Sequence, residues 1–232
     1  MPSAARHRPA LLGPARTMFS LFQKDPDKLL KSATAHRAAG RLDKAIGDLR
    51  EAYRIIAKGD VVYPVETFLR LPLYLQEANR PDEAWSEFYA LLQHGFPLMP
   101  RDPCLLPMFH SSIYNKMRLF LQRQGFPLLA CCYGIGSRYA SGVGLYRQKR
   151  VDELLAFLDV DSEREMVTTM LKKAKAVEKV DTILSATATF RKSIATTEPI
   201  QVIYAVCDAL QVSAEYAGPS KSRTSVPEAT AG

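Results

Sequence analysis

No apolar stretch in this sequence approaches the roughly 18 residues that a membrane-spanning helix requires. The longest apolar runs, 127–133 and 200–209, have a length that suits buried helices. An alternating apolar and polar pattern, which would indicate half-buried strands, is also missing between the two ends of the chain. These absences argue against a membrane protein and favour an all-α fold.

Cysteine is scarce, and its spacing excludes the common zinc and redox motifs. Cys104, Cys131, Cys132 and Cys207 form no CxxC pair and no zinc-type cluster. Cys131 and Cys132 lie in an apolar stretch, where a free cysteine behaves as a small hydrophobic residue. We expect buried thiols in a reducing cytosol, with redox or metal chemistry at the adjacent pair as the alternative.

Histidine gives no catalytic constellation either. His7, His36, His94 and His110 fall in separate segments, without a cysteine or a carboxylate at ligand spacing. We expect His94 to lie at a helix C-terminus, where its charge suits the helix dipole, and His110 to precede a helix start. The sequence therefore predicts no catalytic residues, no metal and no cofactor.

Acidic residues are absent from the first 17 positions, where Arg6, Arg8 and Arg16 supply three of the net seven positive charges. The remaining chain is only mildly basic, which does not by itself indicate nucleic-acid binding. Segment 1–17 also lacks the apolar region of a signal peptide. Because Met18 opens an amphipathic segment, we expect translation to begin there, with a transit peptide as the alternative.

The far end is rich in Ser, Thr, Pro, Gly and Ala, and it has too few large apolar residues to offset the entropy of ordering. We therefore divide the chain into a disordered or mis-annotated extension (1–17), helix hairpins (18–146), C-terminal helices (147–213) and a disordered tail (214–232). The hydrophobic content of 47% is ample for a core in the two middle parts.

Apolar residues in the middle of the chain recur at spacings of three and four, which predicts amphipathic helices. Pro72 should kink or restart one of them near Leu71. Short turns join the helices in pairs, so neighbours should be antiparallel. The expected helices are 27–40 with 43–58, 65–78 with 82–94, and 111–124 with 127–146.

A common spacing relates the three pairs. Gly40, Asn79 and Gly125 each stand five residues before an alanine, namely Ala45, Ala84 and Ala130. Glycine and asparagine adopt the left-handed conformation that ends a helix. The small alanine, one turn into the next helix, lets two helices approach closely.

The segments GRLDKAIGDLREAY (40–53) and NRPDEAWSEFYALL (79–92) resemble the tetratricopeptide repeat. The resemblance implies that the helix-B positions are filled by Ala45, Leu49 and Ala52 in one repeat and by Ala84, Phe88 and Leu91 in the next. It covers roughly 27–146. The Trp-Leu-Gly-Tyr signature of the first helix is missing, and the offsets between repeats are 39 and 46 residues, against about 34 in the family. The expected fold is therefore a short, irregular TPR-like α-solenoid of antiparallel hairpins.

After residue 146 the pattern changes to helices that could cover the apolar end of the stack. We expect helices at 151–158, 163–193 and 200–210. Asp161 and Ser162 suit the N-cap of the long helix, and Glu165 would complete a capping box.

Two segments hold candidate ligand-binding features. The glycine-rich stretch 133–144, with Arg138, could cradle a phosphate, but its helical flanks favour close helix crossing instead. Lys172, Lys175 and Lys179 would share one face of a long helix and, with Lys173 and Arg191–Lys192, could bind an acidic partner or nucleic acid. The acids between them favour a solvated face.

Repeated hairpins without a catalytic constellation indicate a cytoplasmic scaffold that binds another protein or a peptide, and the composition suggests a bacterial or phage accessory protein. The alternatives are a nucleic-acid-associated regulator and an enzyme with a site near Arg138. In helical-repeat proteins, first-helix residues that packing does not need form the binding surface. The candidates are Arg70, Gln76, Asn79, Asn115, Arg118 and Gln122.

Overall fold

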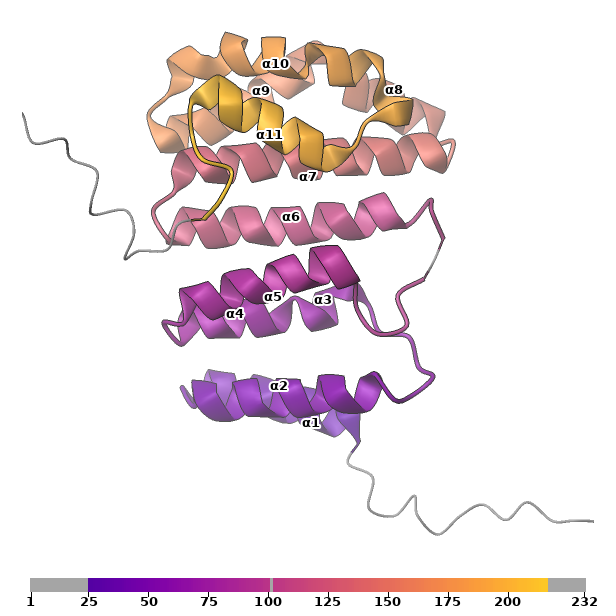
Figure 1. The fold of residues 1–232 in the computed structure, drawn as a ribbon, viewed down its shortest axis with the longest axis vertical. Helices are drawn as coiled ribbons and strands as arrows, with labels where there is room; N and C mark the ends of the chain where they lie inside the picture. The colour runs from indigo at the N-terminus through magenta and orange to yellow at the C-terminus, as the bar shows by residue number, and fades with distance from the viewer. Residues whose placement is uncertain (1–24, 101, 217–232) are drawn as a thin grey trace, which may run out of the picture.

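A computed structural model describes residues 25–100 and 102–216, and every regular element in those residues is helical. Neighbouring helices pack as antiparallel pairs that follow one another along the long axis of the molecule (Figure 1). The pairing predicted from the sequence is thus confirmed. The α-helices are α1 (Pro26–Ala38), α2 (Leu42–Ile56), α3 (Val65–Phe68), α4 (Arg70–Glu77), α5 (Pro81–His94), α6 (Leu106–Arg123), α7 (Pro127–Arg147), α8 (Val151–Leu158), α9 (Val160–Ala174), α10 (Val180–Lys192) and α11 (Pro199–Leu210).

The turns that join the first helix pairs have the geometry expected from their residues. Gly40, Asn79 and Gly125 have φ angles of 71°, 57° and 83°, in the left-handed region. The alanines five residues later, Ala45, Ala84 and Ala130, are fully buried between helices. The expected restart near Pro72 is also present, because a break at Leu69 separates α3 from α4 and places Pro72 in the first turn of α4.

The prediction of a single long helix at 163–193 is wrong. The chain leaves α9 at Lys175, whose φ of 54° is left-handed, passes through the 3-10 turn η2 (Val177–Lys179) and folds back as α10. The reversal brings Leu171 and Ile183, both fully buried, into the core. An extended helix would have left the apolar stripe of one half without a partner to pack on.

Two expected helix starts also differ from the structure. Asp159, rather than Asp161 or Ser162, caps α9, and its carboxylate accepts a hydrogen bond from the Ser162 N–H at 2.9 Å. Helix α6 begins at Leu106, one turn earlier than expected, so His110 lies inside the helix rather than before it. Pro107 in the first turn suits this start.

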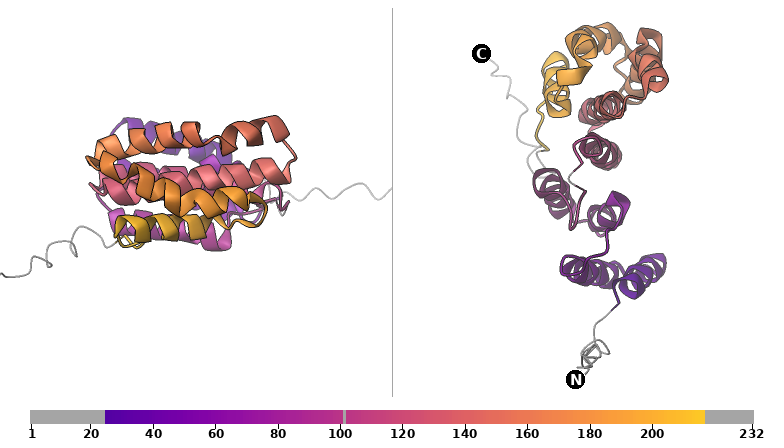
Figure 2. Two further views of the ribbon diagram at one scale, coloured as in Figure 1. Left: turned by 90° about the horizontal axis from the view of Figure 1, so that it is seen from above. Right: turned by 90° about the vertical axis from the view of Figure 1, so that its right-hand side faces the viewer.

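Helix α7 is the central helix of the second half, with α6, α8, α9 and α11 packed around it (Figure 2). Its glycines lie where neighbours come closest. A Cβ at Gly142 would stand 2.5 Å from the Phe157 ring of α8, and one at Gly136 would overlap Ile203 of α11. The expectation that the glycine-rich segment permits close helix crossing is confirmed, and the segment is helix rather than a phosphate-binding loop.

The C-terminal end of the described chain returns to the hairpins. After α11 it runs back toward α6 (Figure 1), where the Tyr216 ring packs against Trp85, Phe120 and Phe126 at centroid distances of 5.2–5.3 Å. The tail expected to be disordered is 214–232, but residues 214–216 are described and Tyr216 is packed, so the predicted boundary lies too early. Segments 1–17 and 217–232 lie outside the described residues. None of the described helices combines the length and apolarity that crossing a bilayer requires.

Substituting Gly136 by alanine should destabilise the protein, because Ile203 is fully buried and has no room to move away from the added methyl group. Overpacking of this kind costs about 1–3 kcal/mol. The matched control is Gly47→Ala on the exposed side of α2, where nothing lies within 4 Å of the added Cβ. Because alanine is the better helix former by about 0.5–1 kcal/mol, the control should be neutral or stabilising.

The check is urea unfolding followed by circular dichroism, comparing midpoints. Equal shifts for the two variants would show that Gly136 is not a close-packing position.

Candidate functional site

An open groove with a volume of about 700 Å³ is lined by residues of α6, α7, α8 and α9. Helix α7 forms its floor, and α6 and α9, which both pack on α7, contribute its two walls. The α6 wall presents Asn115, Arg118 and Gln122, which lie on one helix face at spacings of three and four. The α9 wall presents residues from Ser162 to Lys173, and Phe157 of α8 closes one side.

Arg118 is held in this groove by neutral hydrogen-bond acceptors. Its Nε and Nη2 atoms donate to the Asn115 side-chain oxygen at 3.0 and 2.9 Å, and its Nη1 donates to the Gln122 oxygen at 3.4 Å. Burial lowers the pKa of this guanidinium, because the charged form loses solvation. The amides fix the orientation of Arg118 without neutralising its charge.

The absence of a side chain at Gly134 gives Arg118 its place. A Cβ at Gly134 would stand 2.8 Å from Arg118 Cδ and equally 2.8 Å from the sulfur and methyl group of Met170 on α9. The stem of Arg118 and the end of Met170 therefore both lie over the bare backbone of α7 at Gly134. Gly134 is thus a point of the floor that both walls approach closely.

Arg138 is the second cation of the groove. Its Nη2 donates to the Phe157 carbonyl at 2.6 Å, and its guanidinium carbon lies 4.6 Å from the centre of the Phe157 ring. The buried Nε of Arg138 has no hydrogen-bond partner among the described residues. Burial lowers the pKa of Arg138, partly offset by the nearby carboxylate of Glu163.

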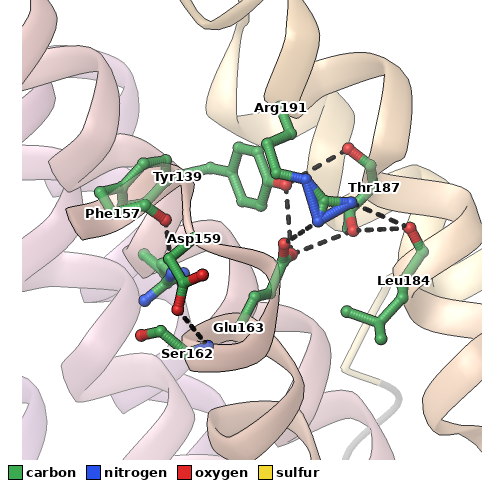
Figure 3. A network of polar contacts seen from close by, with 9 residues as sticks. Tyr139, Phe157, Asp159, Ser162, Glu163, Leu184, Thr187 and Arg191 are labelled. Carbon is green, nitrogen blue, oxygen red and sulfur yellow. Dashed lines mark hydrogen bonds and ion pairs between the residues drawn. The ribbon is translucent and has the colours of Figure 1, made fainter. Parts of the chain in front are cut away.

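A buried polar network fixes α9 relative to α7 and α10 (Figure 3). The Glu163 carboxylate, only 1% exposed, accepts hydrogen bonds from Arg191 at 2.6 Å, Thr187 at 3.0 Å and Tyr139 at 3.1 Å. These four residues come from three helices, α7, α9 and α10. Because a buried charge is tolerated only when it is paired and hydrogen-bonded, this network demands one relative position of the helices.

The structure brings together three of the six residues predicted as a partner-binding surface. Asn115, Arg118 and Gln122 all line the groove.

The other three predicted residues are placed elsewhere. Arg70 on α4 donates to the Leu30 carbonyl at 2.8 Å and to the Thr34 hydroxyl at 2.7 Å, and so ties α4 to α1. Gln76 is buried and donates to the Phe120 carbonyl at 3.0 Å. Asn79 occupies the left-handed turn before α5. Each of these residues already makes an intramolecular contact or a turn.

Sequence reasoning missed the α9 wall. Met166 and Met170 fall in the helix expected to cover the end of the stack, although their i, i+4 spacing marks an apolar stripe. Lys173 is expected on a basic helix face that could bind an acidic partner, not in a groove. The basic face expected from Lys172, Lys175 and Lys179 is also not formed as predicted. Lys175 ends α9 and Lys179 lies in η2, so these residues do not share one helix.

The cysteines and histidines do not converge on this groove. Cys131, Cys132 and Cys207 are buried free thiols, and burial raises the pKa of Cys131 to about 12. His94 lies in the last turn of α5, as expected, and the His110 ring lies 6.1 Å from that of Tyr114. Among the described residues, no cluster of His, Cys, Asp and Glu has the composition of a metal site.

Searches of protein-family models, curated proteins and solved structures with this chain give no match. The residues and geometry of the groove are therefore the basis for assigning a function.

Removing Arg191 should be strongly destabilising, because it leaves the Glu163 carboxylate buried without its cation. The expected cost of Arg191→Met is about 3–5 kcal/mol. The double variant Glu163→Gln/Arg191→Met should recover part of this loss, since no uncompensated charge remains. Unfolding midpoints of Arg191→Met, Glu163→Gln and the double variant, each compared with the unchanged protein, complete a double-mutant cycle. Additive losses would show that the pair is not coupled.

Proposed function

We propose that this protein is a non-catalytic scaffold that binds a segment of another protein in the groove between α6, α7 and α9. The observation that carries the proposal is the row Asn115, Arg118 and Gln122, which holds a partly buried guanidinium in a fixed orientation inside an open groove. Preorganised polar groups beside apolar ones are typical of binding sites.

The arrangement of the hairpins supports the same proposal. The helix pairs from α1 to α7, with their buried alanines and left-handed turns, are what a short, irregular stack of TPR-like units would require. The groove takes one wall from α6, the first helix of the third pair. Stacks of helical repeats use extended concave surfaces of this kind for binding.

The size of the groove suits a short peptide segment. The lining residues of α9 run from Ser162 to Lys173, which corresponds to roughly 16 Å along a helix that rises 1.5 Å per residue. An extended chain covers that length in about five residues. The groove is thus long enough for several side chains of a partner.

Nucleic-acid binding is the second candidate function. It is favoured by the three cations of the groove, Arg118, Arg138 and Lys173. It is less favoured than protein binding because the lysines expected to form one basic helix face are divided between α9 and η2.

The scaffold proposal predicts a position-specific cross-link. A photo-reactive amino acid at Thr169, exposed on the groove wall, should capture a discrete protein in an extract of the cells that produce the chain. The control position is Lys44 on α2, which is exposed and far along the stack from the groove (Figure 1). Capture at Thr169 alone supports the groove. Equal capture at both positions, or none at Thr169, contradicts the proposal.

A further inference from the structure

We propose that the groove selects segments that carry aspartate or glutamate next to an apolar residue, with the carboxylate received between Arg118 and Lys173. This inference rests on the proposed function, since it names the chemistry of the segment that the scaffold binds. Three independent features of the groove lead to it: unpaired cations, a shortage of acids, and apolar side chains beside the cations.

The cations of the groove lack the partners that arginines commonly have elsewhere in the described chain. Arg37 lies within ion-pair distance of Glu77, Arg164 within 2.8 Å of Asp181, and Arg191 within 2.6 Å of Glu163. Arg118, by contrast, bonds only to the amide oxygens of Asn115 and Gln122. Arg138 bonds only to a carbonyl oxygen, although the Glu163 and Asp159 carboxylates partly compensate its charge from beyond ion-pair distance. Neutral acceptors orient a guanidinium but leave its charge available to an incoming anion.

The balance of charge on the groove lining is positive. Arg118, Arg138 and Lys173 face a single lining carboxylate, that of Glu165. Two of these cations are partly withdrawn from water, which strengthens their attraction for an anion because the local dielectric is lower than in bulk solvent. A carboxylate that also accepts from the remaining N–H groups of Arg118 would form charge-assisted hydrogen bonds.

The position of Arg118 places apolar surface beside the charge. Its stem and the end of Met170 both lie over Gly134, and Met166 stands one turn earlier on the same face of α9. Lys173 lies three residues after Met170, and so on the same side of that helix. Methionine side chains adapt to differently shaped apolar partners. When an acidic residue of the bound segment contacts the cations, the adjacent apolar residue of that segment would lie against the methionines.

An acidic protein segment fits these features better than nucleic acid. The groove lining holds methionines and one phenylalanine but no tyrosine or tryptophan, and no regular row of cations extends beyond it along α9. Single-stranded nucleic acid is bound by aromatic platforms and by a basic path that follows the backbone. One or two carboxylates in a short segment need only the few cations present.

The test is selection of short random peptides on the full chain, followed by binding measurements with the enriched peptides. We expect enrichment of Asp or Glu adjacent to Leu, Met or Phe. Arg118→Gln should weaken binding of these peptides by at least about tenfold, since hydrogen bonds to charged groups are lost. Lys173→Gln should weaken it several-fold. Lys172→Gln is the matched control, because Lys172 is exposed on the same helix outside the groove lining and should leave binding unchanged.

Circular dichroism and the unfolding midpoint of each variant separate a lost contact from a lost fold. Lys173→Gln, on an exposed position, keeps the test valid if Arg118→Gln does not fold. Equal losses for Lys172→Gln and Lys173→Gln would overturn the inference, since the effect would then follow net charge and not the groove.

The remaining outcomes distinguish the inference from the function beneath it. Enrichment of neutral peptides that block the Thr169 cross-link would overturn the acidic preference but leave the scaffold proposal standing. A single-stranded oligonucleotide that binds more tightly than any peptide, and loses affinity in Arg118→Gln, would replace the protein segment with nucleic acid. No enriched peptide together with no cross-link at Thr169 would contradict both proposals.

Discussion

The close approach of neighbouring helices to α7 is the constraint on which the rest of the second half depends. At three glycines of α7, the space that a Cβ would fill is occupied by side chains of neighbouring helices. Ile203 occupies it at Gly136, Phe157 at Gly142, and Arg118 with Met170 at Gly134. Because α7 lacks Cβ atoms at these points, four other helices pack directly on its backbone. The same constraint forms the floor of the groove and positions its principal cation.

Apolar packing alone would allow α9 to slide or rotate on α7. The carboxylate of Glu163 removes this freedom, since its acceptors must be satisfied at once by Tyr139 of α7 and by Thr187 and Arg191 of α10. The start of α9 is therefore fixed by the buried network, while the neighbouring positions from Ser162 to Lys173 line the groove. The same helix, α9, thus contributes both to the buried polar network and to the groove.

The local features of this fold could be predicted from the sequence, and the long-range ones could not. Gly40 predicts a turn because glycine readily adopts the left-handed conformation, and Ala45 predicts a close helix contact because its side chain is small. The reversal at Lys175 has no such signal, because lysine does not favour the left-handed conformation that it adopts. Arg70 appeared free for a partner, yet it bonds to residues about one repeat away, which depends on how α4 docks on α1. Asn115, Arg118 and Gln122 could be identified because their spacing on one helix face is a local property.

The most direct test of the account is nuclear magnetic resonance of isotope-labelled methionine methyl groups during titration with an acidic peptide selected on the full chain. Met166 and Met170 line the groove, whereas Met117 is fully buried in the core between the hairpins. The account predicts that the signals of Met166 and Met170 shift together and saturate, while that of Met117 stays in place. Binding that leaves both groove methyl signals unchanged would show that the segment binds elsewhere and would contradict the assignment of the groove.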